Sequence, residues 1–184
     1  MPLYMDLPLS KEALKPLRTG DILYLSGPLY TARDAAHKRI AVAVSSGQKP
    51  PIDLTDAAIF YTGPCPAKPG APSGPLSPTT SARMDSFVEL MFKLGMSSMI
   101  GKGDRAPYVT DLCRHYGGVY LLGFGGAAAL TASWVIASEL VAYEDLGTEA
   151  IRRLTVEKMK VIVGIDSLGT VLMEQEIPKY RYNG

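Results

Sequence analysis

Apolar residues recur along the chain at two periods, and stretches of the two periods alternate. Short aliphatic and β-branched runs bounded by glycine or polar residues predict buried strands. Apolar positions three or four residues apart predict helices between them. The expected strands are 1–9, 21–30, 57–62, 97–101, 119–122 and 140–143, and the expected helices are 11–17, 31–46, 77–94, 107–116 and 127–136. Strands and helices in alternation indicate an α/β domain whose sheet is partly parallel.

The end of the chain has a different pattern. Two runs of strand-forming residues, 160–165 and 170–173, flank the turn-forming string Asp166-Ser-Leu-Gly169. This arrangement predicts a β-hairpin, which adds an antiparallel portion to the sheet. We therefore expect a three-layer α/β domain with mixed parallel and antiparallel sheets.

The segment 63–78 interrupts the alternation. It holds six prolines and three glycines, so a linker between domains is one interpretation. A stiff, ordered loop is the favoured one, because a signal for a helix start follows immediately. Proline lowers the entropy cost of ordering a loop, which suits a loop that holds a functional site.

Composition limits the classes of function. The 184 residues carry a net charge of +1, and the basic residues are scattered among acids, which argues against a nucleic-acid surface. No apolar run reaches the roughly 18 residues that span a membrane. The first residues lack the basic and apolar regions of a signal peptide. We therefore expect one domain, without a nucleic-acid or membrane partner, in the cytoplasm.

The chain has two cysteines, Cys65 and Cys113, far apart and without metal-ligand spacing. Two buried free thiols are expected, with a disulfide as the alternative. Two thiolates cannot complete the usual four-thiolate ligation of an iron–sulfur cluster.

A first cluster of polar side chains lies in Thr31-Ala-Arg-Asp-Ala-Ala-His-Lys-Arg39. We expect Thr31 to be the N-cap of the helix, and Arg33 and His37, four residues apart, to share one of its faces. A helix N-terminus attracts anions, so Arg33 makes it a candidate carboxylate site with His37 beside it. The alternative is that Arg33 pairs with Asp34 or another acid and that His37 is a surface residue whose hydrogen bonds are satisfied.

A second cluster follows the proline-rich segment, where Ser77 is the expected N-cap and Pro78 the first helical residue. The next hydroxyls exceed what capping requires, and Arg83 can bind a carboxylate through two parallel hydrogen bonds. The hydroxyls are those of Thr79, Thr80 and Ser81. The alternative is simply a polar helix start.

Two glycine-rich strings follow strands. Lys102 lies between two glycines at the end of a predicted strand, where α/β folds often bind ligands, although a plain turn with a solvated lysine is the alternative. The string Gly123-Phe-Gly-Gly-Ala-Ala128 fits a dinucleotide-binding fingerprint. It lies too late in the chain for that function, so we interpret it as close helix–sheet packing.

Five motifs, in order and across nearly the whole chain, resemble the β subunit of the iron–sulfur-dependent hydro-lyases, namely the class I fumarases and the L-tartrate dehydratases. They are Thr31-Ala-Arg-Asp-Ala-Ala-His-Lys-Arg39, Gly63-Pro-Cys-Pro66, Gly74-Pro-Leu-Ser-Pro-Thr-Thr-Ser-Ala-Arg-Met-Asp85, Met99-Ile-Gly-Lys-Gly103 and Gly125-Gly-Ala-Ala-Ala-Leu130. The resemblance implies one swivelling β/β/α domain over residues 1–184.

The resemblance also implies a reaction, the reversible hydration of fumarate to L-malate, and roles for seven residues. The residues expected to bind the dicarboxylic acid are Arg33, Thr79, Thr80, Arg83 and Lys102. Those expected to handle a proton or to orient the group that does so are Thr31 and His37, with Arg33 counted among the catalytic residues.

A partner is implied as well. In this family a separate α subunit supplies three thiolates to a 4Fe-4S cluster, so we expect no metal ligand in this chain, Cys65 included, and an α2β2 assembly that is active only when both subunits are present. The β subunit of L-tartrate dehydratase is one alternative function, and a non-catalytic anion-binding or assembly domain is another.

Overall fold

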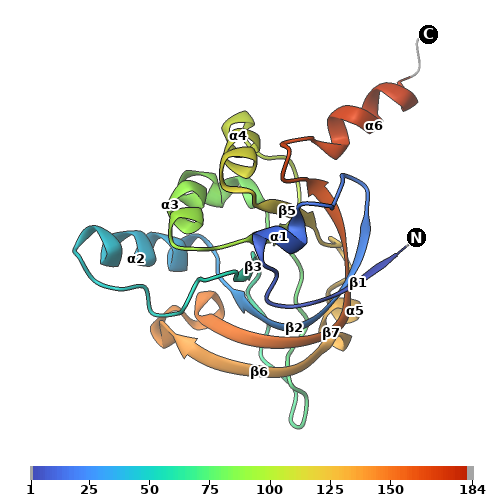
Figure 1. Cartoon of the computed structure of the whole chain (residues 1–184). Helices are drawn as coiled ribbons and strands as arrows, with labels where there is room; N and C mark the ends of the chain where they lie inside the picture. Colours follow the sequence, from blue (N-terminus) through green and yellow to red (C-terminus); the bar gives the residue numbers. More distant parts are fainter. Residues whose placement is uncertain (1, 182–184) are drawn as a thin grey trace.

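The computed structural model describes residues 2–181 (Figure 1), which form a curved mixed sheet with helices against it. The strands are β1 (Leu3–Asp6), β2 (Ile22–Thr31), β3 (Ala58–Phe60), β4 (Ser98–Gly101), β5 (Val119–Leu122), β6 (Val135–Ala142) and β7 (Ile151–Ile165). The α-helices are α1 (Lys11–Leu14), α2 (Asp34–Ser45), α3 (Val88–Lys93), α4 (Pro107–Tyr116), α5 (Ala128–Ser133) and α6 (Leu172–Tyr180). Two 3-10 helices are η1 (Ser81–Phe87) and η2 (Glu144–Glu149).

The sheet follows the order β1-β2-β3-β4-β5-β7-β6, and β2 also pairs with β7. Strands β1 to β5 pair with one another in parallel, whereas β7 is antiparallel to β2, β5 and β6. Because β7 reaches both β2 and β5, the strands β2, β3, β4, β5 and β7 close into a ring. The predicted mixed sheet is confirmed.

Strands β3, β4 and β5 separate two apolar cores, because alternate side chains of a strand point to opposite faces. One face packs against β2 and β7, and the other packs against α2, α3 and α4. Side chains of the first face are Phe60, Ile100 and Leu121, and those of the second are Ile59, Met99 and Tyr120. The order is therefore sheet, sheet, helices, as in the expected three-layer β/β/α arrangement (Figure 1).

The predicted hairpin at the end of the chain is wrong. Strand β7 runs from Ile151 to Ile165 and pairs with β2 between Arg152 and Ile162, while residues 172–180 form α6. Only an isolated bridge joins Ile165 to Val171. Residues 172–176, with leucine, methionine, glutamate and glutamine, favour a helix. The antiparallel portion of the sheet exists, but β2, β5 and β6 provide its partners.

Four predicted helix boundaries are also wrong. Helix α1 ends at Leu14 rather than at Leu17. Helix α2 begins at Asp34 rather than at Thr31, and η1 begins at Ser81 rather than near Ser77. In both places sheet hydrogen bonds hold the residues extended: Ala32 donates to Phe60 O, and Thr79 donates to Tyr61 O. Helix α5 ends at Ser133, because the residues from Val135 onward pair with β7.

Several local signals are confirmed. Helix α4 has the predicted bounds and ends at Gly117, whose φ of 69° is the left-handed conformation that glycine favours. The segment 63–78 contains no helix or strand. Across residues 2–181, every helix is too short or too polar to cross a bilayer.

Candidate active site

The predicted binding residues meet at one edge of the sheet. Arg33 follows β2, Thr79 and Arg83 follow β3 after the proline-rich segment, and Lys102 follows β4. Parallel strands end at the same edge, which is where α/β folds bind ligands. Backbone contacts bring two of these segments together, because Thr80 forms a β-bridge with Lys102, and Ser81 N donates to Lys102 O at 3.0 Å.

Two arginines of this edge share one carboxylate. Asp34 Oδ1 lies 3.8 Å from Arg33 Nε and 3.7 Å from Arg83 Nη1. Both distances are too long for hydrogen bonds, and within residues 2–181 neither Arg33 Nε nor Asp34 Oδ1 has a hydrogen-bond partner. Arg83 Nη2 also donates to Thr79 Oγ1 at 3.1 Å. The pairing of Arg33 with Asp34 is thus present, and the two guanidinium groups lie close enough to act on one small dianion.

Glu149 is a further carboxylate at this site that sequence reasoning missed. Its Oε1 lies 3.2 Å from Arg33 Nη2, and its Oε2 accepts a hydrogen bond from Ala35 N at 3.2 Å. The two segments are 114 residues apart along the chain. No local pattern around Glu149 indicates this contact.

The neighbouring loop depends on Gly63. A Cβ at this position would collide with the carbonyl oxygen of Thr148, and it would lie 3.4 Å from Arg33 Cδ. The absence of a side chain therefore lets the start of the proline-rich segment pack against both Arg33 and the end of η2.

His37 is buried, with 1% of its surface exposed, so it is not an ordinary surface residue. Its Nδ1 lies 2.8 Å from Arg33 O, and its ring contacts Tyr61 and Phe87. Burial lowers the pKa of His37 to about 4. The neutral ring donates from Nδ1, since a carbonyl oxygen can only accept. The geometry therefore favours orienting Arg33 over donating a proton.

Thr31 is fully buried at the end of β2. Its hydroxyl donates to Ala150 O at 3.4 Å and accepts from Arg152 N at 3.0 Å. These contacts join β2 to the start of β7, and the predicted catalytic role of Thr31 gains no support from them.

A buried network supports the site from beneath. Arg105 Nε lies 2.6 Å from Asp85 Oδ1, and the guanidinium lies over the rings of Tyr61 and Tyr120. The Tyr120 hydroxyl is 2.9 Å from Ser81 Oγ, which accepts from the backbone N–H of Lys102 at 3.0 Å. Burial raises the pKa of Tyr120 to about 12, so its hydroxyl stays protonated.

Gly101 makes this network possible, because a Cβ there would collide with Ser81 Oγ. Together these contacts fix the backbone that carries Thr80 and Lys102. Sequence reasoning missed Asp85, Arg105 and Tyr120 as supports of the site.

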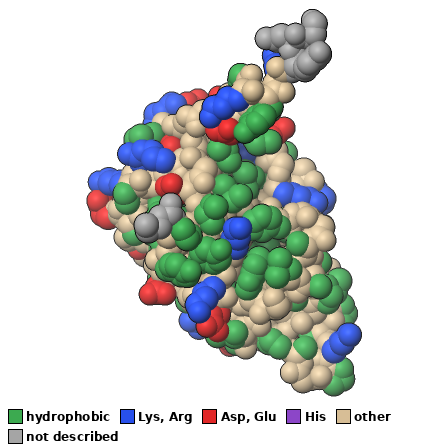
Figure 2. Space-filling model, turned by 90° about the vertical axis from the view of Figure 1, so that its right-hand side faces the viewer, with side chains coloured by type: hydrophobic (Ala, Val, Ile, Leu, Met, Phe, Trp, Pro, Cys, Tyr) green, Lys and Arg blue, Asp and Glu red, His purple; other side chains and the backbone are tan. Residues whose placement is uncertain are grey.

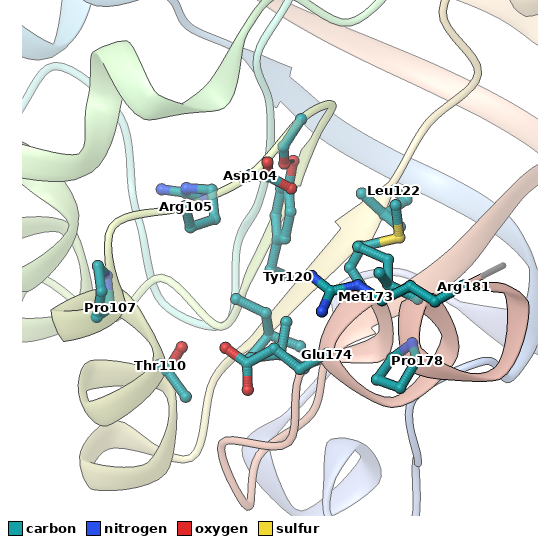
Figure 3. A pocket seen from close by; sticks show the side chains of 15 residues that line it. Asp104, Arg105, Pro107, Thr110, Tyr120, Leu122, Met173, Glu174, Pro178 and Arg181 are labelled. Carbon is teal, nitrogen blue, oxygen red and sulfur yellow. Dashed lines mark hydrogen bonds between the residues drawn. The ribbon is translucent and has the colours of Figure 1, made fainter. Parts of the chain in front are cut away.

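Two cavities lie outside this edge. One, of about 440 Å³, separates α6 from the 103–107 loop and the end of β5 (Figure 3). Asp104, Arg105 and Tyr120 line one side of it, and Met173 and Glu174 line the other. The second, of about 340 Å³, lies between the proline-rich segment and β6. Neither of these two cavities is lined by any of the seven predicted site residues, of which Thr31 and His37 are buried.

Part of the surface is apolar. Figure 2 shows hydrophobic side chains gathered across the face that carries the N-terminus and α6 in Figure 1. Exposed apolar residues of β1, β2 and α5 are Leu3, Tyr4, Ile22 and Leu130. A gathering of this kind often marks a contact with another protein.

The described residues do not fit an iron–sulfur cluster. Within residues 2–181, no three His, Cys, Asp or Glu side chains are placed to hold a metal ion. Cys65 is exposed and Cys113 is buried, and both are free thiols. Burial raises the pKa of Cys113 to about 12, which disfavours the thiolate that metal binding requires.

Comparison with known proteins gives consistent results. A family model described as the fumarase C-terminus matches residues 2–176. The anaerobic class I fumarate hydratase of Escherichia coli K12 is 40% identical over 159 residues, which are 85% of this chain and 29% of that protein. The mitochondrial fumarate hydratase 1 of Leishmania major is 39% identical over 162 residues, which are 87% of this chain and 29% of that protein.

A separate subunit also matches. The β subunit of L(+)-tartrate dehydratase from Escherichia coli K12 is 33% identical over 176 residues, which are 93% of this chain and 86% of that subunit. The chain thus spans less than a third of the fumarate hydratases that it matches, but most of the length of this subunit.

Proposed function

Because the chain belongs to the family of fumarase C-terminal domains, we propose that it is the β subunit of a hydro-lyase that interconverts fumarate and L-malate. The observation that carries the proposal is the placement of Arg33 and Arg83 around a single carboxylate at the sheet edge, where Thr79 accepts from Arg83 and the backbone of Lys102 pairs with Thr80. Two guanidinium groups suit the two carboxylates of a C4 diacid.

In this proposal the chain binds the substrate and stabilises charge. Removal of a proton from the carbon next to a carboxylate spreads negative charge onto that carboxylate. Cations and hydroxyl donors that are already in place lower the cost of that charge. The groups assigned to this role are Arg33, Thr79, Thr80, Arg83 and Lys102. Each comes from a backbone segment that sheet contacts or the buried network hold in place.

His37 does not accept the proton in this proposal. Its Nδ1–H is engaged with Arg33 O, and its basic Nε2 is buried, without a hydrogen-bond partner among residues 2–181. The nearby carboxylates of Asp34 and Glu149 face arginines. We therefore assign the proton-accepting group to the partner subunit.

The proposal includes a separate α subunit that holds the 4Fe-4S cluster, in an α2β2 assembly. The exposed apolar face and the match to a separate β subunit support a partner. The two free cysteines are fewer than the usual ligand set of a cluster, which supports our assignment of the cluster to the partner. The cytoplasmic location inferred from the sequence stays a prediction.

L-tartrate dehydration is the second candidate, favoured by the match over 86% of a tartrate dehydratase β subunit. Tartrate carries one more hydroxyl than malate, and the same two arginines could bind its carboxylates. A non-catalytic anion-binding domain is less well supported, because the relatives that the chain matches are named as fumarate hydratases and a tartrate dehydratase subunit.

The test is to tag the chain, purify it anaerobically from its own host, and assay the complex with L-malate and with L-tartrate. Formation of fumarate from malate by an iron-bearing complex supports the main proposal, and a preference for tartrate supports the second. Recovery of this chain alone, without iron or turnover, contradicts both.

A further inference from the structure

The Glu149 carboxylate has two partners at the start of α2. Oε1 lies 3.2 Å from Arg33 Nη2, and Oε2 accepts from Ala35 N at 3.2 Å. The side chains of Glu149 and Arg33 are each 24% exposed, so solvent screens this pair less than a surface ion pair.

Helix α2 needs an acceptor at this point. Its N-cap residue is Arg33, whose side chain makes no capping hydrogen bond. The first N–H groups of a helix have no partner within the helix, and a negative charge near them is favourable. Glu149 therefore supplies from η2 what Ser or Asp usually supplies locally, and the same carboxylate holds the guanidinium of the cap residue.

The arginine is restrained from several sides. Its Nη2 faces Glu149 and its Nε faces Asp34, while its Cδ lies beside Gly63 and its carbonyl oxygen is held by His37. Nε and Nη2 form one edge of the planar guanidinium group, and both acids lie along that edge. The Nη1 corner remains for an incoming carboxylate.

We propose that Glu149 is a positioning residue for substrate binding, which holds the Nε–Nη2 edge of Arg33 so that the Nη1 corner faces the substrate carboxylate. This inference rests on the proposed function and assigns a role to a residue outside the predicted site. The substitution Glu149→Gln separates its two contacts. The amide oxygen of glutamine still accepts from Ala35 N. An uncharged NH2 group takes the place of the carboxylate oxygen that faces Arg33, so the attraction for the guanidinium group is lost.

The chain offers a matched control. Asp145 also lies in η2 and also pairs with an arginine of α2, with its Oδ1 2.6 Å from Arg39 Nη1 and its Oδ2 2.7 Å from Arg39 Nη2. Asp145→Asn therefore weakens a contact between the same two elements without touching Arg33. If looser packing of η2 on α2 were the cause, both Glu149→Gln and Asp145→Asn would lower kcat/KM.

The experiment measures kcat and KM of the assembled enzyme, with the substrate that the wild-type complex uses, for Glu149→Gln, Asp145→Asn, Arg33→Ala and the double variant Arg33→Ala/Glu149→Gln. Misplacing a group by about 1 Å can cost on the order of 100-fold. We expect Glu149→Gln to lower kcat/KM by about 10- to 100-fold, with most of the loss in KM, and Asp145→Asn to stay within about twofold of wild type.

The double variant decides whether Glu149 acts through Arg33. Residues that act through each other are not additive, so the double variant should match Arg33→Ala within about twofold. A Glu149→Gln enzyme equal to wild type, or an equal loss in the presence and absence of Arg33, overturns the inference. If the wild-type complex neither binds nor converts a dicarboxylate, the proposed function fails and this inference fails with it.

Discussion

The arginine beneath the sheet edge and the two arginines at the edge are held in different ways. Arg105 is 1% exposed, and its Nε lies 2.6 Å from Asp85 between two tyrosine rings. Arg33 and Arg83 are 24% and 49% exposed, and their carboxylate contacts are 3.2 to 3.8 Å long. The buried arginine therefore has the shorter carboxylate contact, whereas the two arginines at the edge have longer contacts and more exposed side chains.

The difference follows from the cost of burying charge. A buried ion pair is tolerated only when its geometry is good, because both ions have lost their water. A buried polar group without a partner is costly, so such groups in a native structure call for an explanation. Within residues 2–181 such groups occur both at the edge and beneath it: Arg33 Nε and Asp34 Oδ1 at the edge, and Arg105 Nη2 in the buried pair.

The largest expected effect is on the buried pair. Asp85→Ala leaves the Arg105 charge without its partner and removes the acceptor for Ala106 N, so it should destabilise the chain by about 3–5 kcal/mol. Denaturant unfolding of the purified chain measures this. Asp111→Ala, which removes an exposed partner of Arg114, is the control and should leave the unfolding midpoint unchanged. Similar unfolding midpoints for the two variants would show that the buried pair of Arg105 and Asp85 contributes no more to stability than an exposed pair.

The edge arginines should show the opposite profile. Arg33→Ala or Arg83→Ala should cost about 2–5 kcal/mol of transition-state binding, measured as kcat/KM of the assembled enzyme, with little change in unfolding. Arg39→Ala on the same helix α2 is the matched control, and it should keep full activity. Near-normal kcat/KM in both edge variants would exclude these arginines from the site.

His37 lies on α2, close to the edge residue Arg33, but its side chain is buried. Desolvation lowers its pKa from 6.5 to about 4, and the positive charge of Arg105 acts in the same direction, while the Arg33 carbonyl and Asp34 oppose the shift. Because the unfolded chain takes up the proton first, the free energy of unfolding should fall as the pH drops from 6.5 towards 4, by up to about 3 kcal/mol.

The test compares how the free energy of unfolding of wild type and of His37→Gln changes with pH. Well above pH 6.5 the two proteins should show the same slope, because His37 is then neutral in both the folded and the unfolded chain. An equal slope for both proteins between pH 6.5 and 4 would show that His37 is not the group responsible.

The smallest expected effect concerns the link between the two regions. Ser81→Ala removes the acceptor for Lys102 N and a partner of the Tyr120 hydroxyl, and each buried group left unpaired costs about 1–3 kcal/mol. Unfolding should report that loss, and kcat/KM should fall less than in Arg83→Ala. Ser133→Ala, whose exposed hydroxyl bonds only its own helix, is the control. Unchanged stability in Ser81→Ala would mean that this network does not support the site.

The periodicity of the sequence predicted most elements because their signals are local. Gly117 ends α4, and the β-branched run around β5 forms the expected strand. The hairpin prediction failed because the run 160–165 finds its partners in β2 and β5, which are distant in sequence, and no local pattern records such pairings. The proposed caps failed for the same reason, since sheet contacts override a capping signal at Thr31 and Ser77.

Some residues of the candidate site are indicated by the sequence, and others are placed there only by the fold. Arg33, Arg83 and Lys102 follow predicted strands, so the edge rule for parallel sheets and the family resemblance both indicate them. Glu149 and Asp85 reach the site only through tertiary contacts, and their sequence surroundings do not distinguish them from other surface acids. Thr31 fits a local capping pattern, and the fold uses its hydroxyl elsewhere.

The pairing of β7 with β2 also has a kinetic consequence. Arg152 N reaches Thr31 Oγ1 across 121 residues of chain, and the ring of strands cannot close until β7 has been synthesised. Contacts between distant parts of a chain slow folding, because the entropy of a large loop is lost before they form. During synthesis β2 has an unpaired edge, and such edges promote aggregation. Truncation before β7 should therefore yield insoluble chains rather than a smaller folded unit.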